Sequence, residues 1–510
     1  MFKKLTFIAS RPLCLCETTC HPNQTHGPAS NTISFTKSRK SIMSKHTLPV
    51  GIDDLACHIP ALYLDLNDLA AARGIAYEKL ALGLGLLKMA VTDAHEDAAT
   101  MAAEAIAGLM SKNNLRPEQI GRIYLGTESA LDDAKPTATY AVEMVQQRLG
   151  GSFRHCDVTD MTFACIGAVD ALENCLDWVA SDRERMAIVV ASDVAKYELE
   201  STGEYTQGAG AVALLVKWHP RLLVVPRRFG TAMESVHDFY KPRRAHFTET
   251  PVFDGPLSNG CYQARMEEAL VRFREVANAP ELALSDRWER LIFHLPYAFH
   301  AKRAYVETFI KERRAAGDWD LLCEKNGIEN LAPPASIFPG LVDKKWQSVV
   351  KAVSQSPEYK HFVKQKIEKG QRASSEVGNL YTASIFMALM STLTADMEDG
   401  SRLAGKRLGF VAYGSGSKSK VFEGIVQKGW RDAASGFQLK EQLAHRRRID
   451  YPTYELLHRH ALARPVFPQE GRFALHSIGQ EGTVLGARYY GSFHLNGSVE
   501  VKRNVFAHAL

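Results

Sequence analysis

Long apolar runs and a strong excess of one charge are both missing from this chain. No stretch of its 510 residues approaches the apolar length that crosses a bilayer as a helix. The formal net charge is only +5, and no run of lysines forms a basic stripe. The sequence therefore predicts a protein that has neither a membrane nor a nucleic acid as its partner.

The spacing of a metal site is missing as well. The nine cysteines are scattered, and no pair of histidines completes a zinc pattern with them. A zinc site needs three or four converging ligands, so we expect no metal. Reduced thiols in a cytoplasmic protein are the expected state of Cys57, Cys156, Cys175, Cys261 and Cys323.

Acidic residues are nearly missing from residues 1–45, where Glu17 is the single one. This segment is rich in Ser, Thr, Lys and His, a composition typical of a transit-type presequence. The alternative is a disordered tail or an upstream start codon, with Met43 as the working start. We favour this alternative over a presequence.

What the chain does contain is an ordinary globular composition, 45% hydrophobic and 23% charged. Its length permits a large core or two fused core halves. Near-continuous apolar runs at 186–191 and 209–216 are typical of strands buried on both faces. Alternating strands and helices predict an α/β layer architecture. We expect helices at 95–112, 136–149, 166–180, 300–316 and 380–395, and further strands at 122–126, 290–295 and 407–413.

Cys165 stands in the most informative segment, Asp-Met-Thr-Phe-Ala-Cys-Ile-Gly-Ala-Val-Asp-Ala-Leu. Apolar residues recur at helical spacing behind it, from Ala168 to Val179. We therefore expect the thiol at a helix N-terminus, where the helix dipole and free N–H groups favour a thiolate and an adjacent oxyanion. This predicts an acyl-accepting nucleophile; the alternative is a buried small apolar residue.

Further polar groups follow other predicted strands. Glu128 ends Ile-Tyr-Leu-Gly-Thr-Glu, and His294 ends Leu-Ile-Phe-His. Asn379 lies in Gly-Asn-Leu-Tyr-Thr, and Ser415 lies in Tyr-Gly-Ser-Gly after an apolar strand. Because open α/β sheets gather ligands at strand ends, we expect these groups to meet at one site.

These segments together resemble the 3-hydroxy-3-methylglutaryl-CoA synthase family of the thiolase-like superfamily. The resemblance runs in order from about residue 50 to about residue 430, with a weaker echo near 470–494. It is carried by Gly-Thr-Glu-Ser-Ala-Leu-Asp at 126–132, Phe-Ala-Cys at 163–165, the segments at 191–197 and 201–213, Asp-Phe-Tyr-Lys-Pro at 238–242, Asp-Gly-Pro-Leu-Ser at 254–258, Cys-Tyr at 261–262, and the histidine, Gly-Asn-x-Tyr-Thr and Tyr-Gly-Ser-Gly segments.

The resemblance implies a duplicated, thiolase-like αβαβα fold, although no repeat is visible in the sequence. We expect an N-terminal half at 46–220 with the nucleophile, and a C-terminal half at 221–430. The charged residues 311–377 are expected to be a helical insertion, either a lid or a solvated elaboration, and we favour the latter. Residues 431–510 are expected to be an extension that completes the second half.

The resemblance also implies the chemistry. Cys165 would accept an acetyl group from acetyl-CoA, Glu128 would remove a proton from its methyl group, and His294 would bind acetoacetyl-CoA. Asp193 and Asp238 would support the active-site geometry, and Asn379 would supply a further hydrogen-bond donor. The backbone N–H groups of Cys165 and of the segment near Ser415 would form the oxyanion hole. Lys302 and Arg303 would contact the CoA phosphates. No cofactor beyond the CoA thioesters is expected, and the family implies a homodimer.

Two departures from the family pattern affect substrate identity. Ile166 stands where a tyrosine is usual, which removes a polar wall beside the acyl group, and Phe299 stands where a lysine is usual, which removes a charge near the CoA. A synthase that branches a carrier-bound β-ketone, a decarboxylating ketoacyl synthase and a non-catalytic acyl-CoA-binding homologue remain alternatives. The combination of Glu128, Cys165 and His294 argues against the last.

Overall fold

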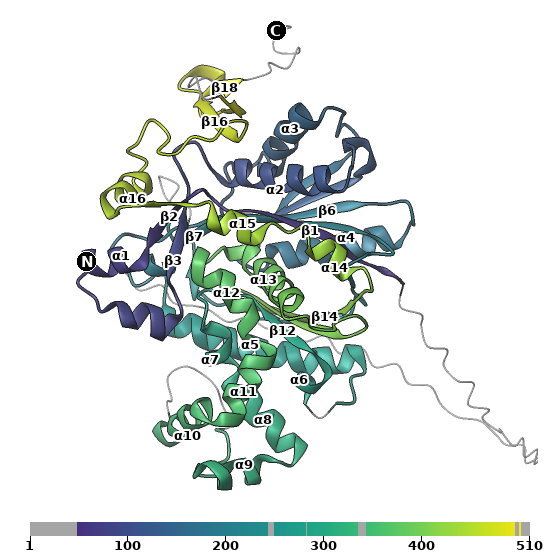
Figure 1. Cartoon of the computed structure of the whole chain (residues 1–510), viewed down its shortest axis with the longest axis vertical. Helices are drawn as coiled ribbons and strands as arrows, with labels where there is room; N and C mark the ends of the chain where they lie inside the picture. The colour runs from purple at the N-terminus through teal and green to yellow at the C-terminus, as the bar shows by residue number, and fades with distance from the viewer. Residues whose placement is uncertain (1–47, 243–248, 282, 335–342, 495–498, 501–510) are drawn as a thin grey trace, which may run out of the picture. The chain divides into compact units, whose positions relative to one another are not determined.

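The computed structural model describes residues 48–242, 249–281, 283–334, 343–494 and 499–500 (Figure 1). All of them belong to the compact unit Thr47–Leu510. The expectations for residues 1–45 lie outside the described residues. Within the described residues, no helix is both long and apolar enough to traverse a bilayer.

The N-terminal half is built on five neighbouring strands. Its strands are β1 (Val50–His58), β4 (Arg122–Gly126), β5 (Asp157–Met161), β6 (Ala187–Ala195) and β7 (Gly208–Trp218). Their order in the sheet is β5-β4-β6-β7-β1. β4 runs parallel to both β5 and β6, whereas β7 is antiparallel to β6 and β1. The predicted strand at 122–126 is confirmed, and it places Glu128 just beyond the end of β4.

Both faces of this part of the sheet are buried, as the apolar runs predicted. On β7, Val212 and Leu214 belong to the main hydrophobic core, while Ala213 and Leu215 belong to a second core. The main core includes the nucleophile helix α4 (Gly167–Ala180), and the second includes α2 (Ala98–Lys112) and α3 (Thr137–Leu149). Since side chains alternate along a strand, α4 covers one face and α2 with α3 the other.

The C-terminal half adds further strands to the same sheet. They are β8 (Leu223–Val224), β9 (Gly230–Met233), β12 (Arg290–Phe293), β13 (Arg407–Gly414) and β14 (Lys418–Val426). Because β8 pairs with β1 on one side and with β14 on the other, the described strands of the two halves join into one ten-stranded sheet. Helix α5 (Gly255–Ala277) packs on β9, β13 and β14, and α13 (Ser384–Glu398) packs on β12.

The segment between the histidine strand and the Gly-Asn-Leu-Tyr-Thr segment is helical, as predicted. Its helices are α7 (His300–Ala304), α8 (Val306–Ala316), α9 (Trp319–Asn326), α10 (Lys344–Gln355), α11 (Pro357–Lys366) and α12 (Glu368–Val377). The single helix expected at 300–316 is divided at Tyr305 into α7 and α8. Helices α8 to α11 lie together in Figure 1 around an aromatic cluster of Phe309, Tyr359 and Phe362. In contrast, α12 packs against α13 in the body of the fold.

The C-terminal extension contacts both halves. It contains α14 (Trp430–Ala434), α15 (Leu439–Ala444), β15 (Arg447–Ile449), α16 (Tyr451–His458) and a small sheet of β16 (Phe473–Ile478), β17 (Arg488–Phe493) and β18 (Val499–Glu500). α14 packs against α13, whereas β15 pairs with β2 (Leu62–Asp65) of the first half. The carboxylate of Glu104 on α2 binds both Arg148 and Arg472, which ties the small sheet to the first half.

Candidate active site

Cys165 lies in a tight turn immediately before helix α4. The preceding residue, Ala164, has a φ of 41°, in the left-handed region that few non-glycine residues adopt. Ile166 is the N-cap of α4, so the thiol stands two residues before the first helical residue. The predicted location at a helix start is therefore confirmed, and the strained turn presents the cysteine apart from the helix body.

Two glycines allow strand ends to approach this turn. A Cβ atom on Gly126, the last residue of β4, would lie 2.2 Å from the backbone nitrogen of Ala168. A Cβ atom on Gly414, the last residue of β13, would lie 2.6 Å from the carbonyl oxygen of Phe163 and 3.0 Å from the nitrogen of Ile166. Only glycine fits at either position. The close approaches carry Glu128 and Ser415, which follow these strands, to the two sides of Cys165.

The Glu128 carboxyl interacts directly with the Cys165 thiol. Burial raises the pKa of Glu128 from 4.5 to about 7; the Lys241 charge counteracts this, while Asp193 adds to it and the Cys165 thiol donates a hydrogen bond that favours the carboxylate. Its Oε1 atom is buried and has no hydrogen-bond partner among the described residues. A carboxyl that titrates near neutrality and has a free oxygen is suited to proton transfer.

The thiol itself differs from the sequence-based expectation. Burial, followed by the charge of Glu128, raises the pKa of Cys165 well above its usual value. We had expected the helix N-terminus to favour a thiolate. The neighbouring carboxylate and the loss of water act in the opposite direction and keep the sulfur protonated before substrate binds.

Aromatic rings surround the sulfur. Cys165 forms a small buried cluster with Ala195, Tyr197, Phe239 and Tyr381. The Tyr197 ring lies edge-on to those of Phe239 and Tyr381, each at 6.3 Å between centroids. The cluster is separate from the main core and excludes water from the thiol. This apolar wall explains why burial dominates the pKa values of both Cys165 and Glu128.

Lys241 is a site residue to which the sequence analysis assigned no role. Its Nζ atom donates a hydrogen bond of 2.9 Å to the backbone oxygen of Glu128 and lies 5.2 Å from the centroid of the Tyr381 ring. Its charge lowers the pKa values of both Glu128 and Cys165. Its place within Asp-Phe-Tyr-Lys-Pro was the available signal, but the pattern does not show where the ammonium group points.

Asp193 fixes the base segment. Its Oδ1 atom accepts hydrogen bonds from the backbone N–H of Glu128 at 2.7 Å and from the hydroxyls of Thr127 and Ser129 at 3.0 Å. Its Oδ2 atom accepts from the backbone N–H and the hydroxyl of Thr382. Asp193 is completely buried, and burial raises its pKa. It therefore ties the Glu128 loop to the Gly-Asn-Leu-Tyr-Thr segment.

Asn379 lies in that same segment, which reaches from the second half to the residues just before β7. The backbone N–H of Asn379 donates to the carbonyl of Thr206 at 2.9 Å, and its side-chain Oδ1 accepts from the N–H of Tyr381 at 2.9 Å. Gly378, at a φ of 79°, packs against the carbonyl of Gln207 so closely that a Cβ would lie 1.9 Å from the oxygen. Asn379 is thus held two residues before Tyr381, which belongs to the Cys165 cluster.

His294 directly follows β12 and is 2% exposed. Its backbone N–H donates to the carbonyl of Val411 at 3.0 Å, and the hydroxyl of Tyr262 donates to its carbonyl at 3.0 Å. Burial lowers the pKa of His294 to about 3, assisted by the nearby His300. The imidazole is therefore neutral, and its buried Nδ1 atom has no partner among the described residues. A neutral imidazole can donate one hydrogen bond to a substrate oxygen.

Asp238 holds the turn that contains Ser415. Its Oδ1 atom accepts a hydrogen bond of 2.7 Å from the N–H of Gly416, and its Oδ2 atom accepts from the hydroxyls of Tyr413 at 2.8 Å and Ser258 at 3.0 Å. This carboxylate is completely buried. These contacts fix the shape of the Ser415 turn, and the preceding Gly414 is the residue that approaches the nucleophile turn at Phe163.

Lys302 and Arg303 lie on α7, where their side chains contact neighbouring turns. Arg303 donates to the carbonyl of Gly83 at 2.6 Å, within the π-helical turn η1 (Lys79–Leu84). Lys302 Nζ lies 3.1 Å from the centroid of the Phe299 ring, and that ring fills the space over Gly85. The structure therefore groups these two cations with Phe299 and not with the Cys165 cluster.

The other departure from the family pattern, Ile166, is placed differently from the expectation. We expected it to replace a polar wall beside the acyl group. Its side chain is completely buried in the main core, whereas Cys165 belongs to the separate aromatic cluster. Its Cγ2 atom would lie 2.8 Å from a Cβ on Gly414. Ile166 therefore packs the base of the turn instead of lining the acyl site.

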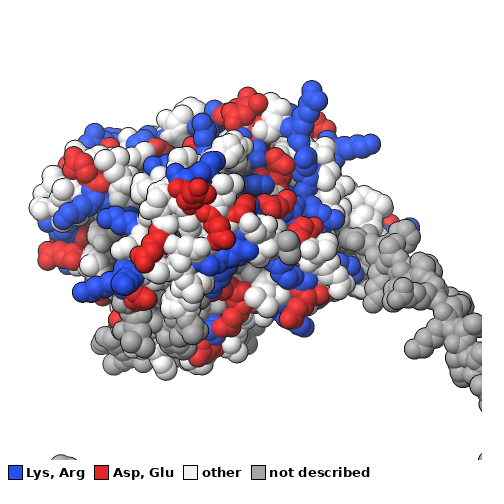
Figure 2. Space-filling model, turned by 90° about the horizontal axis from the view of Figure 1, so that it is seen from below, with Lys and Arg blue, Asp and Glu red and all other residues white. Residues whose placement is uncertain are grey.

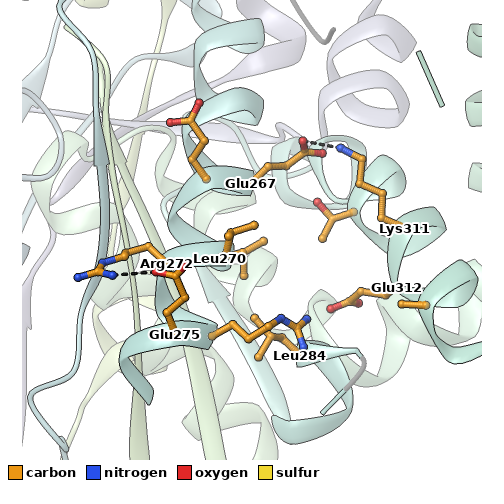
Figure 3. A pocket seen from close by; sticks show the side chains of 12 residues that line it. Glu267, Leu270, Arg272, Glu275, Leu284, Lys311 and Glu312 are labelled. Atoms are coloured by element: carbon orange, nitrogen blue, oxygen red, sulfur yellow. Dashed lines mark hydrogen bonds and ion pairs between the residues drawn. The ribbon is translucent and has the colours of Figure 1, made fainter. Parts of the chain in front are cut away.

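A hollow of about 500 Å³ lies elsewhere, among α5, α6 (Leu284–Arg287) and α8. Figure 3 shows the ion pair between Glu267 and Lys311 at its edge, 2.6 Å long. None of the predicted site residues lines it. Among the described residues, no three His, Cys, Asp or Glu side chains converge as metal ligands. The described cysteines, including Cys165, are free thiols.

The site contains a buried cysteine in a strained turn, a carboxyl beside it that titrates near neutrality, and a neutral histidine at the end of another strand. These groups define an acyl-transferring enzyme of the thiolase-like kind. Comparison with known proteins agrees with this class. Residues 46–220 match the family profile "Hydroxymethylglutaryl-coenzyme A synthase N terminal", and residues 224–460 match the corresponding C-terminal profile.

Individual relatives give the same result. A hydroxymethylglutaryl-CoA synthase of Haloferax volcanii is 34% identical over 419 residues, which cover 80% of this chain and 91% of the relative. One of Schizosaccharomyces pombe is 31% identical and covers 81% and 90%. A solved structure of MvaS in complex with 3-hydroxy-3-methylglutaryl coenzyme A has a TM-score of 0.74 at 30% identity, covering 87% of this chain and 99% of that one. The chain belongs to the hydroxymethylglutaryl-CoA synthase family.

Proposed function

We propose that this protein condenses acetyl-CoA with acetoacetyl-CoA and releases 3-hydroxy-3-methylglutaryl-CoA and CoA, a step of the mevalonate route to isoprenoids. The observation that supports this most is the mutual influence of the Glu128 carboxyl and the Cys165 thiol on each other's pKa, with the thiol inside a cluster of aromatic rings. A base so close to the sulfur is in place to act on the acyl group that the sulfur holds.

The first step is acyl transfer. The Cys165 sulfur attacks the acetyl carbon of acetyl-CoA, the bond from that carbon to the CoA sulfur breaks, and the thiol proton leaves with CoA. Exchange between two thioesters is nearly balanced, so the acetyl group stays activated on the enzyme. The developing oxyanion would accept hydrogen bonds from the N–H groups of Cys165 and of the Ser415 turn.

The second step forms the carbon–carbon bond. Ionised Glu128 removes a proton from the acetyl methyl group, and the resulting carbon nucleophile attacks the β-carbonyl of acetoacetyl-CoA. The neutral imidazole of His294 donates a hydrogen bond to that carbonyl oxygen as it gains negative charge, and Asn379 would supply a further donor. The resulting alkoxide takes up a proton to give the tertiary alcohol, and Glu128 releases the proton that it accepted from the methyl group. Water then hydrolyses the cysteine thioester and frees Cys165. Both carbon fragments arrive as thioesters, so the proposed reaction uses no cofactor.

A carrier-bound β-ketone is the second candidate acceptor, and Phe299 is the observation that favours it. The ring packs over Gly85 beneath Lys302, at a position where the family resemblance leads us to expect a lysine near CoA. Without that lysine, the site would depend less on binding the nucleotide part of CoA. This is compatible with an acceptor that is attached to a carrier protein. Lys302 and Arg303 still supply cations close by, which is why we favour the CoA acceptor.

The working form that we propose is a homodimer in the cytoplasm. Support for it comes from the family resemblance. The face seen in Figure 2 carries lysines and arginines interspersed with acidic residues, as the small net charge leads one to expect. Sedimentation of the purified protein would give the oligomeric state, and a monomer would contradict this part of the proposal.

The deciding experiment supplies purified protein with labelled acetyl-CoA and identifies the labelled peptide by mass spectrometry. We expect the acetyl group on Cys165. Acetoacetyl-CoA and an acetoacetyl carrier protein are then added in separate reactions. Product with acetoacetyl-CoA supports the proposal, product only with the carrier supports the second candidate, and absence of acetylation contradicts both.

A further inference from the structure

A cluster of four charges links the nucleophile helix to the strand that follows the Ser415 turn. Lys418 Nζ lies 2.5 Å from Oδ2 of Asp170, and Lys420 Nζ lies 2.7 Å from Oδ1 of the same carboxylate. Lys420 also pairs with Glu173. Residues 418 and 420 share one face of β14, and residues 170 and 173 share one face of α4, so each element presents two charges to the other.

The cluster directly adjoins the catalytic turn. The Lys418 ammonium lies 4.1 Å from the centroid of the Phe163 ring, two residues before Cys165. Lys418 is the first residue of β14, only three residues after Ser415. Between them, Gly416 and Ser417 have φ values of 83° and 103°, a left-handed conformation that is costly for the serine. A strained turn keeps its shape only when its surroundings hold it.

Because the four charges are largely buried, they must stay paired, and this fixes the position of β14 relative to α4. The side chains of Asp170, Lys418 and Lys420 are 13%, 15% and 9% exposed. Burial lowers the pKa of Lys420, yet Asp170 and Glu173 outweigh this, and its pKa is raised. Charges removed from water are tolerated only while they remain paired. A shift of the Ser415 turn away from α4 would separate them.

We propose that Asp170 and Lys418 are positioning residues that hold the Ser415 turn against the Cys165 turn, so that backbone N–H donors from both turns meet one thioester oxygen. The two turns come from different halves of the chain and touch at Gly414 and Phe163, where there is no room for a side chain. The charge cluster is the clamp on that contact. This inference rests on the proposed function.

The test separates two reactions of the same sulfur. Acetylation by acetyl-CoA passes through an oxyanion, whereas alkylation by iodoacetamide does not. In Lys418→Met we expect acetylation of Cys165 to slow by about a hundredfold, as for a misplaced catalytic group. The KM for acetyl-CoA should change little, because the clamp acts on the transition state. Alkylation of Cys165, followed on its peptide, should be unchanged, since the charges that act on its pKa are Glu128, Asp193 and Lys241.

Matched variants complete the design. Lys418→Arg keeps the charge and should restore most of the acetylation rate. Lys406→Met is the control: Lys406 lies just before β13, is 55% exposed and pairs with Glu289. Its replacement should leave acetylation unchanged. Asp170→Asn should slow acetylation at least as much as Lys418→Met, because it also removes the partner of Lys420. The losses in the double variant should be less than additive, because both substitutions break the same Asp170–Lys418 pair.

Two outcomes would overturn the inference: wild-type acetylation in Lys418→Met, or an equal loss of acetylation and alkylation. If the wild-type protein takes no acetyl group from acetyl-CoA, the proposed function fails first. The clamp is then tested with p-nitrophenyl acetate, because transfer of its acetyl group to Cys165 passes through the same kind of oxyanion. The same two outcomes, measured with this ester, would overturn the inference.

Discussion

The backbone N–H of Glu128 donates a hydrogen bond of 2.7 Å to Oδ1 of Asp193, which is completely buried. The second carboxylate oxygen of Asp193 accepts from Thr382 of the other half. One buried carboxylate thus sets the backbone position of the proposed base relative to the Thr382 segment, which follows Asp193 by 189 residues. Removing it would leave several buried donors unpaired, which is costly.

Cys165→Ser should abolish acetyl-enzyme formation and leave the fold intact, because a hydroxyl replaces the thiol with little change in volume. Mass spectrometry after incubation with labelled acetyl-CoA measures the acetylation, and thermal unfolding checks the fold. Cys156→Ser, at a half-buried thiol away from the cluster, is the control. Covalent acetylation of a different cysteine in the Cys165→Ser protein would refute the assignment.

Glu128→Ala should acetylate Cys165 but fail to condense. The carboxylate raises the pKa of the thiol, so its loss does not hinder attack by sulfur. Loss of the base should slow condensation by about a hundredfold or more. The two half-reactions are measured separately, by single-turnover acetylation and by release of product from pre-formed acetyl-enzyme. Equal losses in both would show that Glu128 is structural.

The condensation rate should rise with pH through about 7, the pKa of Glu128, because only the ionised carboxylate can accept the methyl proton. Lys241→Met should move that midpoint upward, since the Lys241 charge lowers the pKa of Glu128. The measurement is the condensation rate from pH 5 to 9. Lys440→Met, which removes a surface ion pair with Glu398, is the control and should keep the wild-type midpoint. A downward shift in Lys241→Met would contradict the arrangement.

His294→Ala should weaken use of acetoacetyl-CoA and spare acetylation of Cys165. The imidazole is neutral across the assay range, since its pKa is about 3, so it acts by hydrogen bonding and not by charge. His294→Gln retains an N–H donor and should recover part of the activity. Varying acetoacetyl-CoA in both half-reactions gives the answer. If acetylation collapses while acceptor kinetics persist, His294 belongs to the environment of the nucleophile.

Glu128→Gln should make the protein more stable at pH 8 but hardly at pH 5. The folded-state pKa of Glu128 lies above its unfolded value, so the carboxyl's contribution to stability falls as pH rises from about 4.5 through 7. Glutamine removes that loss, which we put at roughly 3 kcal/mol at pH 8. Denaturant unfolding at both pH values measures it. A gain that is equal at the two pH values would point to packing instead of ionisation.

Local patterns predicted the elements well wherever a long apolar period or a short apolar run was uninterrupted. The strand at 122–126 and the helices near 98–112, 137–149 and 167–180 follow from spacing alone. The division of the expected helix at Tyr305 did not, because the residue fits a helix by propensity and the break depends on packing. The return of the C-terminal strands to Glu104 is likewise a long-range contact that no local pattern encodes.

The sequence by itself determined the family, the order of the strand-end segments and the identity of Glu128, Cys165 and His294 as candidates, because ordered motifs and apolar periods are local properties of the chain. Only the tertiary structure decided the electrostatics. It buries Cys165 against Glu128 and reverses the expected direction of the thiol pKa, it brings Lys241 to the base, and it joins Asp170 to Lys418 across the two halves. These effects depend on burial and on distances between residues far apart in sequence, which spacing along the chain does not specify.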